Sequence, residues 1–261
     1  MKEKSDGSLK SVRKALQIFE LFTIDAPELS ISELVKKLSM PKVSVYRFLR
    51  VLLKSSFITQ DRQTKKYRLG IKIFELGSIV LRNFDLREVA FPLIVELSKR
   101  SGETVHLGVL DNQQVVSIEG VESDQSLRIS LPVGKRVYLH STGIGKAILA
   151  FLPEQEVKEI VRQKRLPRFT NNTIIHFEQL MKEIQLIKKR GYAIDNEENE
   201  PGIRCIAAPI FDVNKQVMAS ISISGPSVRI PHSRIAELSS MVTETSQKIS
   251  KAHGVPLKRL L

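Results

Sequence analysis

SISELVKKLSMPKVSVYRFLRVLLK, at residues 30–54, contains two short amphipathic helices in succession. Apolar residues recur three or four positions apart in each half, at Ile31, Leu34, Val35 and Leu38 and then at Val45, Phe48, Leu49 and Leu52. Ser30 can cap the first helix, and Pro41 is tolerated in the first turn of the second. Because Ser39, Met40 and Pro41 punctuate the chain between the two helices, the stretch indicates a helix-turn-helix.

The flanking segments complete a winged helix-turn-helix. Upstream, one apolar stripe predicts a helix that ends before Pro27, with the inward residues Val12, Ala15, Leu16, Phe19 and Phe22. Downstream, residues 57–60 and 65–69 have strand-like composition, and residues 61–64 suit a hairpin turn between them. Three short helices followed by a hairpin are typical of a winged helix, which we expect over residues 9–70.

Positive charge is concentrated in this part of the chain. The 261 residues contain 41 Lys and Arg against 28 Asp and Glu, a formal net charge of +13. Residues 1–70 alone hold 15 basic and 7 acidic residues, a net charge of +8. Clustered Lys and Arg displace counterions from phosphate backbones, which favours a polyanion-binding module. A solvated basic surface is the alternative that charge alone leaves open.

The outward face of the third helix is basic, and we expect it to enter the major groove of double-stranded DNA. Arg47 and Tyr46 are the candidates for base-edge contacts, because an arginine can hold guanine O6 and N7 with two hydrogen bonds. The wing carries Arg62, Lys65, Lys66 and Arg68, which suit phosphates. The candidate DNA-binding residues are Lys42, Ser44, Tyr46, Arg47, Arg50, Arg62, Lys65 and Lys66. A winged helix that docks a protein is the alternative.

Other features of the sequence exclude several classes of protein. A hydrophobic content of 42% can form a core, which argues against a disordered tail. Residues 1–10 are polar, and no apolar run approaches the ~20 residues of a membrane span, so we expect no secretory signal and no membrane partner. The single cysteine fits the cytoplasm, and the five histidines lie too far apart for a metal site. We therefore expect a cytoplasmic protein with no cofactor.

Residues 71–84 predict a linker helix that is apolar around most of its circumference. Such a helix must be covered on several sides, either by the chain's own domains or by a second chain. DNA-binding helices usually work in pairs on half-sites about one turn apart. We therefore favour a dimerisation helix, which would place two winged helices on a palindromic operator.

Residues 85–254 indicate an α+β domain. Helices are expected at about 86–101, 176–190 and 233–253, strands at about 104–110, 114–121, 203–211 and 217–224, and extended pieces between 127 and 139. In the last strand, apolar residues alternate with Ser220, Ser222 and Ser224, so one face is a row of hydroxyls. If this row faces an interior pocket, its hydroxyls can bind a small polar ligand. If it faces solvent, it is an ordinary polar surface with no binding role.

The segment 140–146 opens a further helix. A P-loop would need other residues where this chain has His140 and Ala147, so nucleotide binding is not expected. The free N–H groups of Gly143 and Ile144 can receive a carboxylate, although a capped helix with nothing bound is equally compatible. Cys205 lacks the surroundings of a cysteine hydrolase, and on its own it suggests a buried, inert thiol.

Several segments together resemble the isocitrate-lyase-regulator (IclR) family of bacterial transcription regulators. They are residues 40–47, 67–70, 140–147, 195–198 and 202–209. The last of them contains Gly-x-x-Cys-Ile-Ala-Ala-Pro and is the most specific, and the match covers residues 9–254. The resemblance implies an α+β fold in two domains, with a winged helix-turn-helix (9–70), a dimerising linker helix (71–84) and a GAF-like effector domain with an antiparallel sheet and helices (85–254).

The resemblance also implies an effector site for a small organic acid. The acid's carboxylate and neighbouring oxygens would meet the backbone of Gly143 and Ile144 and the side chains of Asp195, Cys205, Ser222 and Ser224. An apolar wall would be formed by Ile129, Val137 and Ile203. The resemblance thus makes Cys205 a polar pocket residue, but not a nucleophile.

The expected function is a transcriptional regulator, not an enzyme, whose operator affinity changes when the acid binds. We expect a repressor of catabolic genes that works as a homodimer or a dimer of dimers. Two alternatives remain open at this point. One is an architectural DNA binder that senses no ligand. The other is an enzyme with an N-terminal docking module, using Asp195, Cys205 and a histidine.

Overall fold

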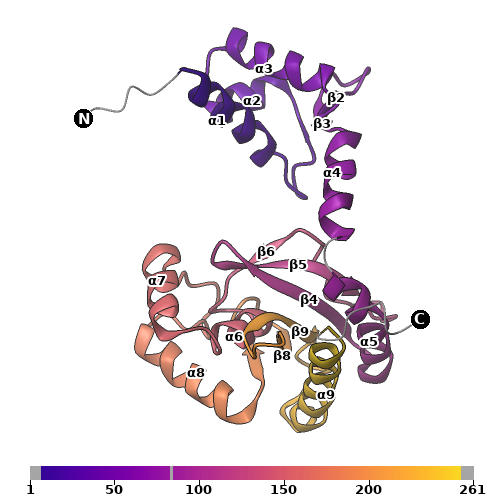
Figure 1. Cartoon of the computed structure of the whole chain (residues 1–261), viewed down its shortest axis with the longest axis vertical. Coiled ribbons are helices and arrows are strands. Elements are labelled where there is room, and N and C mark those ends of the chain that lie inside the picture. Colours follow the sequence, from indigo (N-terminus) through magenta and orange to yellow (C-terminus); the bar gives the residue numbers. More distant parts are fainter. Residues whose placement is uncertain (1–6, 83–84, 254–261) are drawn as a thin grey trace. The chain divides into compact units, whose positions relative to one another are not determined.

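The computed structural model describes residues 7–82 and 85–253, and the chain forms two compact units that divide between residues 83 and 84 (Figure 1). Phe84 and Gly254, which end the expected linker and effector ranges, lie outside the described residues. Each unit has its own hydrophobic core, so each positions its own functional surface.

The first unit is a winged helix, as predicted. Its helices are α1 (Gly7–Glu20), α2 (Ile31–Leu38) and α3 (Lys42–Lys54), followed by the hairpin strands β2 (Ile58–Gln60) and β3 (Tyr67–Leu69). The two-residue strand β1 (Glu28–Leu29) adds to the edge of β3, giving the antiparallel order β1-β3-β2. The sequence did not predict β1, because two residues are too few to show an alternation of apolar and polar side chains.

Local capping and periodicity explain the helix-turn-helix. The Ser30 hydroxyl accepts a hydrogen bond from the Glu33 backbone N–H at 3.3 Å, and the Glu33 carboxylate accepts one from the Ser30 N–H at 2.7 Å. This reciprocal capping box fixes the first turn of α2. Ser39 then adopts the left-handed conformation that ends α2, and α3 begins directly after Pro41. The expected inward residues of α3 are buried or half-buried, which confirms that stripe.

The buried face of α1 differs from the prediction. Val12 and Leu16 are 57% and 54% exposed, whereas Ile18, which the predicted stripe omitted, is fully buried. Phe22 and the half-buried Phe19 do join the core. The apolar residues of α1 cover more than one side of the helix, so spacing alone could not identify the side that faces α2 and α3.

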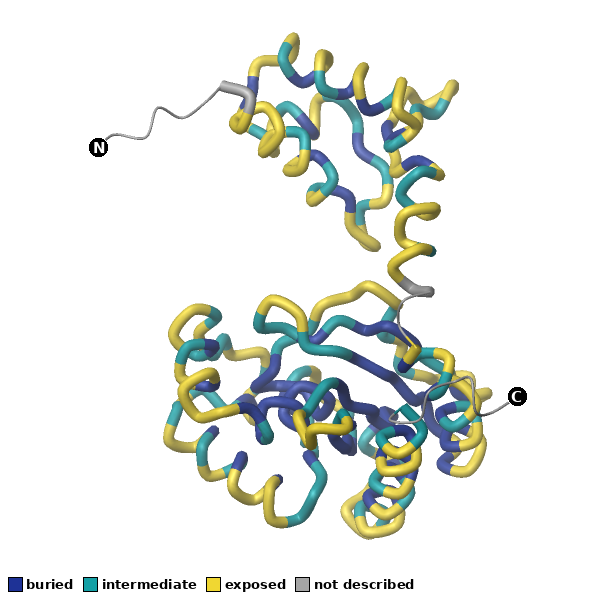
Figure 2. The backbone as a smooth tube through the Cα atoms, viewed as in Figure 1, coloured by how far each residue is buried: buried dark blue, intermediate teal, exposed yellow. Residues whose placement is uncertain are grey.

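The linker helix α4 (Ile71–Arg82) follows the hairpin, and most of its apolar side chains that the structure describes are exposed. In Figure 2 its described part is mostly yellow with some teal and no dark blue. Ile71, Phe74, Ile79 and Val80 are each more than half exposed, and Phe74 reaches 69%. Such an apolar surface is typical of a helix that packs against another protein chain.

The second unit is built on a six-stranded antiparallel sheet in the order β6-β5-β4-β9-β8-β7. Its strands are β4 (Thr104–Asp111), β5 (Gln114–Val121), β6 (Arg136–Val137), β7 (Ala193–Asn196), β8 (Ile203–Phe211) and β9 (Val217–Pro226). The strands predicted at 104–110, 114–121, 203–211 and 217–224 are confirmed to within two residues at their ends. Of the extended pieces expected between 127 and 139, only β6 is a strand.

Helices cover both faces of this sheet. One face packs against α5 (Asp85–Ser101) and α9 (Ile235–His253), where Leu107, Ile206 and Ile221 belong to one core cluster. The opposite face packs against α6 (Gly143–Leu149), and α7 (Glu154–Lys164) and α8 (Phe177–Arg190) belong to the same core cluster. Figure 2 accordingly shows buried backbone running along the central strands. The sequence reading did not include α7.

Candidate functional site

The candidate DNA-binding residues lie on the outer face of α3 and on the turn of the wing. Tyr46 is 47% exposed, and Ser44 is half-buried. The basic members of the set are all exposed: Lys42, Arg47, Arg50, Arg62, Lys65 and Lys66. Within residues 7–82, none of these six cations forms a salt bridge. Their charges are therefore available to an external polyanion.

The α3 face and the wing enclose a groove of about 440 Å³. Val43, Tyr46, Arg47, Arg50 and Gln60 contribute to its lining, so the residues that could read bases lie next to those of the hairpin. The fourth basic residue of the wing behaves differently, since Arg68 is 3.5 Å from the Glu28 carboxylate. It connects β3 to β1 rather than standing free.

In the second unit, strand register brings the polar candidates together. Asp195 on β7 lies opposite Cys205 on β8, and Cys205 lies opposite Ser224 on β9. One row further along the strands, Ser222 on β9 lies opposite His106 on β4. Because side chains alternate between the faces of a sheet, these residues all point to the face that carries α6. The predicted row of hydroxyls therefore faces the protein interior.

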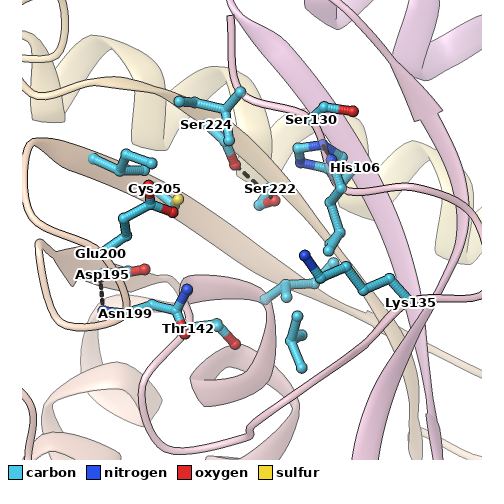
Figure 3. Close-up of a pocket in the computed structure, with 16 residues that line it drawn as sticks. His106, Ser130, Lys135, Thr142, Asp195, Asn199, Glu200, Cys205, Ser222 and Ser224 are labelled. Carbon is cyan, nitrogen blue, oxygen red and sulfur yellow. Dashed lines mark hydrogen bonds between the residues drawn. The ribbon is translucent and has the colours of Figure 1, made fainter. Parts of the chain in front are cut away.

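These residues line a cavity of about 120 Å³ between the sheet and the start of α6 (Figure 3). All nine residues implied as effector-binding contribute to its lining: Ile129, Val137, Gly143, Ile144, Asp195, Ile203, Cys205, Ser222 and Ser224. Seven further lining residues were not among those implied: His106, Ser130, Leu131, Lys135, Thr142, Asn199 and Glu200. The segment 130–135 reaches the cavity by folding back over β5, which no local pattern encodes.

The start of α6 is held tightly against the sheet. The Thr142 hydroxyl caps the helix by accepting from the Gly145 N–H at 3.1 Å and donates to the Tyr138 carbonyl at 2.7 Å. Any Cβ at Gly145 would lie 2.6 Å from the Tyr138 carbonyl oxygen, so only glycine fits. Ser220 anchors the first turn from below by donating to the Ile144 carbonyl at 2.7 Å. The helix end that faces the cavity is therefore rigid.

Burial shifts the protonation of the cavity's ionisable groups. Burial, with repulsion from Glu198, raises the pKa of Asp195 to about 7, so its carboxyl group can both donate and accept hydrogen bonds near neutral pH. Burial lowers the pKa of His106 to about 4, so its ring is neutral, and Nε2 accepts from the Leu131 N–H at 3.2 Å. Burial and the nearby Asp195 raise the pKa of the Cys205 thiol, which disfavours a nucleophilic thiolate.

A buried ion pair supports the wall that contains Asp195. Lys146 on α6 is 1% exposed, and its ammonium group lies 2.5 Å from the Glu198 carboxylate. Glu198 also accepts from the Asn196 N–H at 3.2 Å, and Asp195 accepts from the Glu198 N–H at 2.8 Å. The segment after β7 is thus tied to α6. A lysine inside an apolar helical run was the one available sequence signal for this pair.

Metal and membrane features are not evident in the described parts of the chain. Within residues 7–82 and 85–253, no group of three or more His, Cys, Asp and Glu side chains is placed to hold a metal ion. Within the same residues, no helix combines the length and the apolar character needed to cross a membrane.

Comparison with known families and relatives identifies both units. Residues 11–62 match the family described as "IclR helix-turn-helix domain", and residues 78–251 match "Bacterial transcriptional regulator IclR C-terminal". The transcriptional regulator KdgR of Dickeya chrysanthemi is 38% identical over 97% of this chain and 82% of its own. The transcriptional repressor IclR of Escherichia coli K12 is 31% identical over 95% of this chain and 91% of its own.

Solved structures show the same architecture. IclR of Thermotoga maritima, 39% identical, matches 95% of this chain and all of its own with a TM-score of 0.77. An IclR homologue from Microbacterium hydrocarbonoxydans, complexed with 4-hydroxybenzoate, has the same fold with a TM-score of 0.80, 22% identity and coverage of 93% and 98%. These relatives are transcriptional regulators, not enzymes. The chain belongs to the IclR family of bacterial transcriptional regulators, with an N-terminal helix-turn-helix domain and a C-terminal ligand-binding domain.

Proposed function

We propose that this chain is a transcriptional repressor of catabolic genes whose operator affinity is set by a small organic acid bound in the cavity of its C-terminal domain. The observation that carries this proposal is the cavity itself, which is lined by polar groups of three adjacent strands and a helix start. It contains no activated thiol, because the pKa of Cys205 is raised, so the geometry suits binding rather than catalysis. A family structure that contains 4-hydroxybenzoate supports the choice of an acid.

The acid's carboxylate would lie at the start of α6. The backbone N–H groups of Gly143 and Ile144 are in the first turn, where no intrahelical acceptor exists. Ser222 and Ser224 offer hydroxyls, and Asp195 offers a carboxyl group, from the adjacent strands. Ile129, Val137 and Ile203 would form the apolar wall and Cys205 a small polar contact. Binding would thus connect α6 to β7, β8 and β9.

The winged helix over residues 9–70 would bind operator DNA through the candidate residues on α3 and the wing. The linker helix over 71–84 would pair two copies of the chain, because its apolar side chains are exposed in the single chain. Two copies would present two α3 helices to a palindromic site. A dimer, or a dimer of such dimers, is therefore the proposed assembly.

We expect Phe74→Glu to weaken this dimer at least ~10-fold, since it places a charge in an apolar interface. Sedimentation equilibrium of the full chain measures the effect directly. The matched control is Leu186→Glu on α8, which is 54% exposed and lies in the other unit. Equal dissociation constants for the wild type and Phe74→Glu would show that α4 is not the interface.

Effector binding can change operator affinity only if the acid binds two arrangements of the dimer unequally. A typical coupling of ~1–3 kcal/mol changes affinity ~5–150-fold. An architectural DNA binder would show no such coupling. Footprinting on the upstream DNA, with and without a panel of 2-keto acids, sugar acids and aromatic acids, separates the two functions. Unchanged protection with an acid that calorimetry shows to bind would contradict the regulator.

Asp195→Asn tests the site without removing its structural hydrogen bonds. The amide oxygen can still accept from the Glu198 N–H, and the amide NH2 group then replaces the second carboxyl oxygen, so a hydroxyl of the ligand loses its acceptor. We expect the acid to bind ~10–100-fold more weakly and operator affinity without acid to stay within about twofold of the wild type. Asp212→Asn is the matched control, because Asp212 also accepts two backbone N–H bonds in a turn but lies outside the cavity. Loss of DNA binding together with acid binding would mean that Asp195 is structural.

A further inference from the structure

The cavity of the C-terminal domain has an uneven distribution of charge. Its lining contains one ammonium group, that of Lys135, and two carboxyl groups, those of Asp195 and Glu200. The remaining ionisable ring, His106, is neutral at physiological pH because burial lowers its pKa to about 4. The cavity therefore favours different ligand groups at its two ends. The end with Lys135 favours a negatively charged group that accepts hydrogen bonds, and the end with Asp195 and Glu200 favours a group that donates them.

The backbone places Lys135 firmly at the cavity. Its N–H donates to the Pro132 carbonyl at 3.0 Å, and its carbonyl accepts from the Ser117 N–H on β5 at 3.0 Å. The preceding Gly134 has φ +86°, a left-handed conformation that glycine adopts without strain, and its N–H donates to the Ser117 carbonyl at 2.7 Å. The side chain of Lys135 thus starts from a fixed point beside β5.

The amino group of Lys135 turns into the cavity, as Figure 3 shows. Among the residues that the structure describes, no carboxylate forms a salt bridge with it, whereas the neighbouring Arg136 is paired with Asp111. Lys135 is an exposed residue, and its ammonium group can form a charge-assisted hydrogen bond with an anionic ligand in the cavity. No sequence motif and none of the implied effector contacts include this residue.

Asp195 and Glu200 lie on the opposite side of the cavity in the same view (Figure 3). Either carboxyl group can accept a hydrogen bond from a ligand hydroxyl, and Asp195, whose pKa is raised to about 7 by burial, can also donate one near neutral pH. A second carboxylate of the ligand would instead approach two acidic groups, the buried Asp195 and the exposed Glu200, and its charge would make ionisation of Asp195 still less favourable. Hydroxyl groups satisfy this side of the cavity, and acid groups do not.

We propose that Lys135 is a specificity-determining residue that binds the effector's carboxylate opposite the start of α6, and that the effector is a monocarboxylic acid with hydroxyl groups at its other end. This inference rests on the proposed function and adds the polarity and chemical class of the ligand to it. Lys135 and the backbone N–H groups at the start of α6 donate to the same carboxylate from two sides. Asp195 and Glu200 receive the hydroxyls and reject dicarboxylic acids.

Two matched pairs of acids test the class by calorimetry on the full chain: D-gluconate against D-glucarate, and 4-hydroxybenzoate against terephthalate. In each pair the second acid replaces a hydroxylated end with a carboxylate. We expect at least one monoacid to bind, and to bind at least ~10-fold more tightly than its diacid. Glu200→Gln should narrow that difference several-fold, because it removes the like charge without changing the side-chain shape.

Variants of Lys135 test the residue itself. Lys135→Met should weaken the bound monoacid ~10–100-fold, and Lys135→Arg, which keeps the charge, should retain most of the affinity. Lys182→Met on α8 is the control for a general loss of one positive charge and should change affinity less than about twofold. Thermal unfolding of each variant checks that the domain remains folded.

The outcomes distinguish this inference from the proposed regulatory function on which it rests. Equal monoacid affinity in the wild type and Lys135→Met overturns the role of Lys135. A diacid that binds as tightly as its monoacid, or a failure of both monoacids to bind, overturns the proposed ligand class. Retardation of upstream DNA by the same samples reports on the regulator independently, since Lys135 lies outside the winged helix.

Discussion

Arg47→Ala is expected to weaken operator binding ~10–100-fold while changing the affinity for random DNA less than about threefold. Arg47 is exposed on the outer face of α3 and lines the groove between this helix and the wing. A bidentate arginine–guanine contact contributes ~1–3 kcal/mol of discrimination, whereas phosphate contacts contribute equally on every sequence. Fluorescence anisotropy with a duplex enriched by the wild-type protein, and with a scrambled duplex, measures both affinities.

Arg50→Ala provides the contrast, because Arg50 is the neighbouring exposed cation that we assign to phosphate. It should weaken binding to the two duplexes by the same factor and lower the salt slope by about one. Arg47→Lys should recover only part of the operator affinity, since an ammonium group lacks the rigid planar pair of donors that a guanidinium group offers. A parallel loss on operator and scrambled DNA for Arg47→Ala would remove this residue from base recognition.

The elements that the sequence predicted well are those with a local signal. Capping by Ser30 and the apolar spacing of α2 and α3 lie within about 25 residues, and they identified the helix-turn-helix. The alternation in β9 likewise identified the hydroxyl row, because a strand exposes alternate side chains to opposite faces. In α1 the same method failed, since Val12 and Leu16 continue an apolar pattern on a side that the core does not cover.

The cavity could be predicted only in part. Local patterns had marked the start of α6 and the hydroxyls of β9, and the resemblance extended these to nine lining residues. Their proximity depends on the register of β7, β8 and β9, which links positions far apart in the chain. His106 is brought in by its pairing with Ser222, and Lys135 by a loop that folds over β5. A lysine in a polar loop has the sequence character of a solvated residue. The proposed role of Lys135 in ligand specificity follows only from the positions of Asp195 and Glu200 across the cavity.

Removal of Lys146 is expected to have the largest effect on stability. Its ammonium group is buried against the Glu198 carboxylate, with a Glu183 oxygen 3.8 Å away. Burial already raises the pKa of Glu198, and Lys146 opposes that shift. In Lys146→Met, Glu198 must keep an uncompensated buried charge or take up a proton. Breaking a buried pair in this way costs ~3–5 kcal/mol, which corresponds to a fall of roughly 10 °C in the Tm of this domain.

The double variant Lys146→Met/Glu198→Gln distinguishes two causes of lost stability: the uncompensated buried charge of Glu198, and the loss of the attraction between Lys146 and Glu198. Glutamine keeps an oxygen that can accept from the Asn196 N–H, so most of the lost stability should return. Lys158→Met, which breaks an exposed pair with Glu154, should leave the Tm almost unchanged. Differential scanning calorimetry of the full chain gives the three values. A Lys146→Met transition within 2 °C of the wild type would show that Glu198 relaxes into water, and that the wall carrying Asp195 is not held by this pair. If the large fall occurs, the same variant should also lose acid binding below its Tm, because the segment after β7 supplies one side of the cavity.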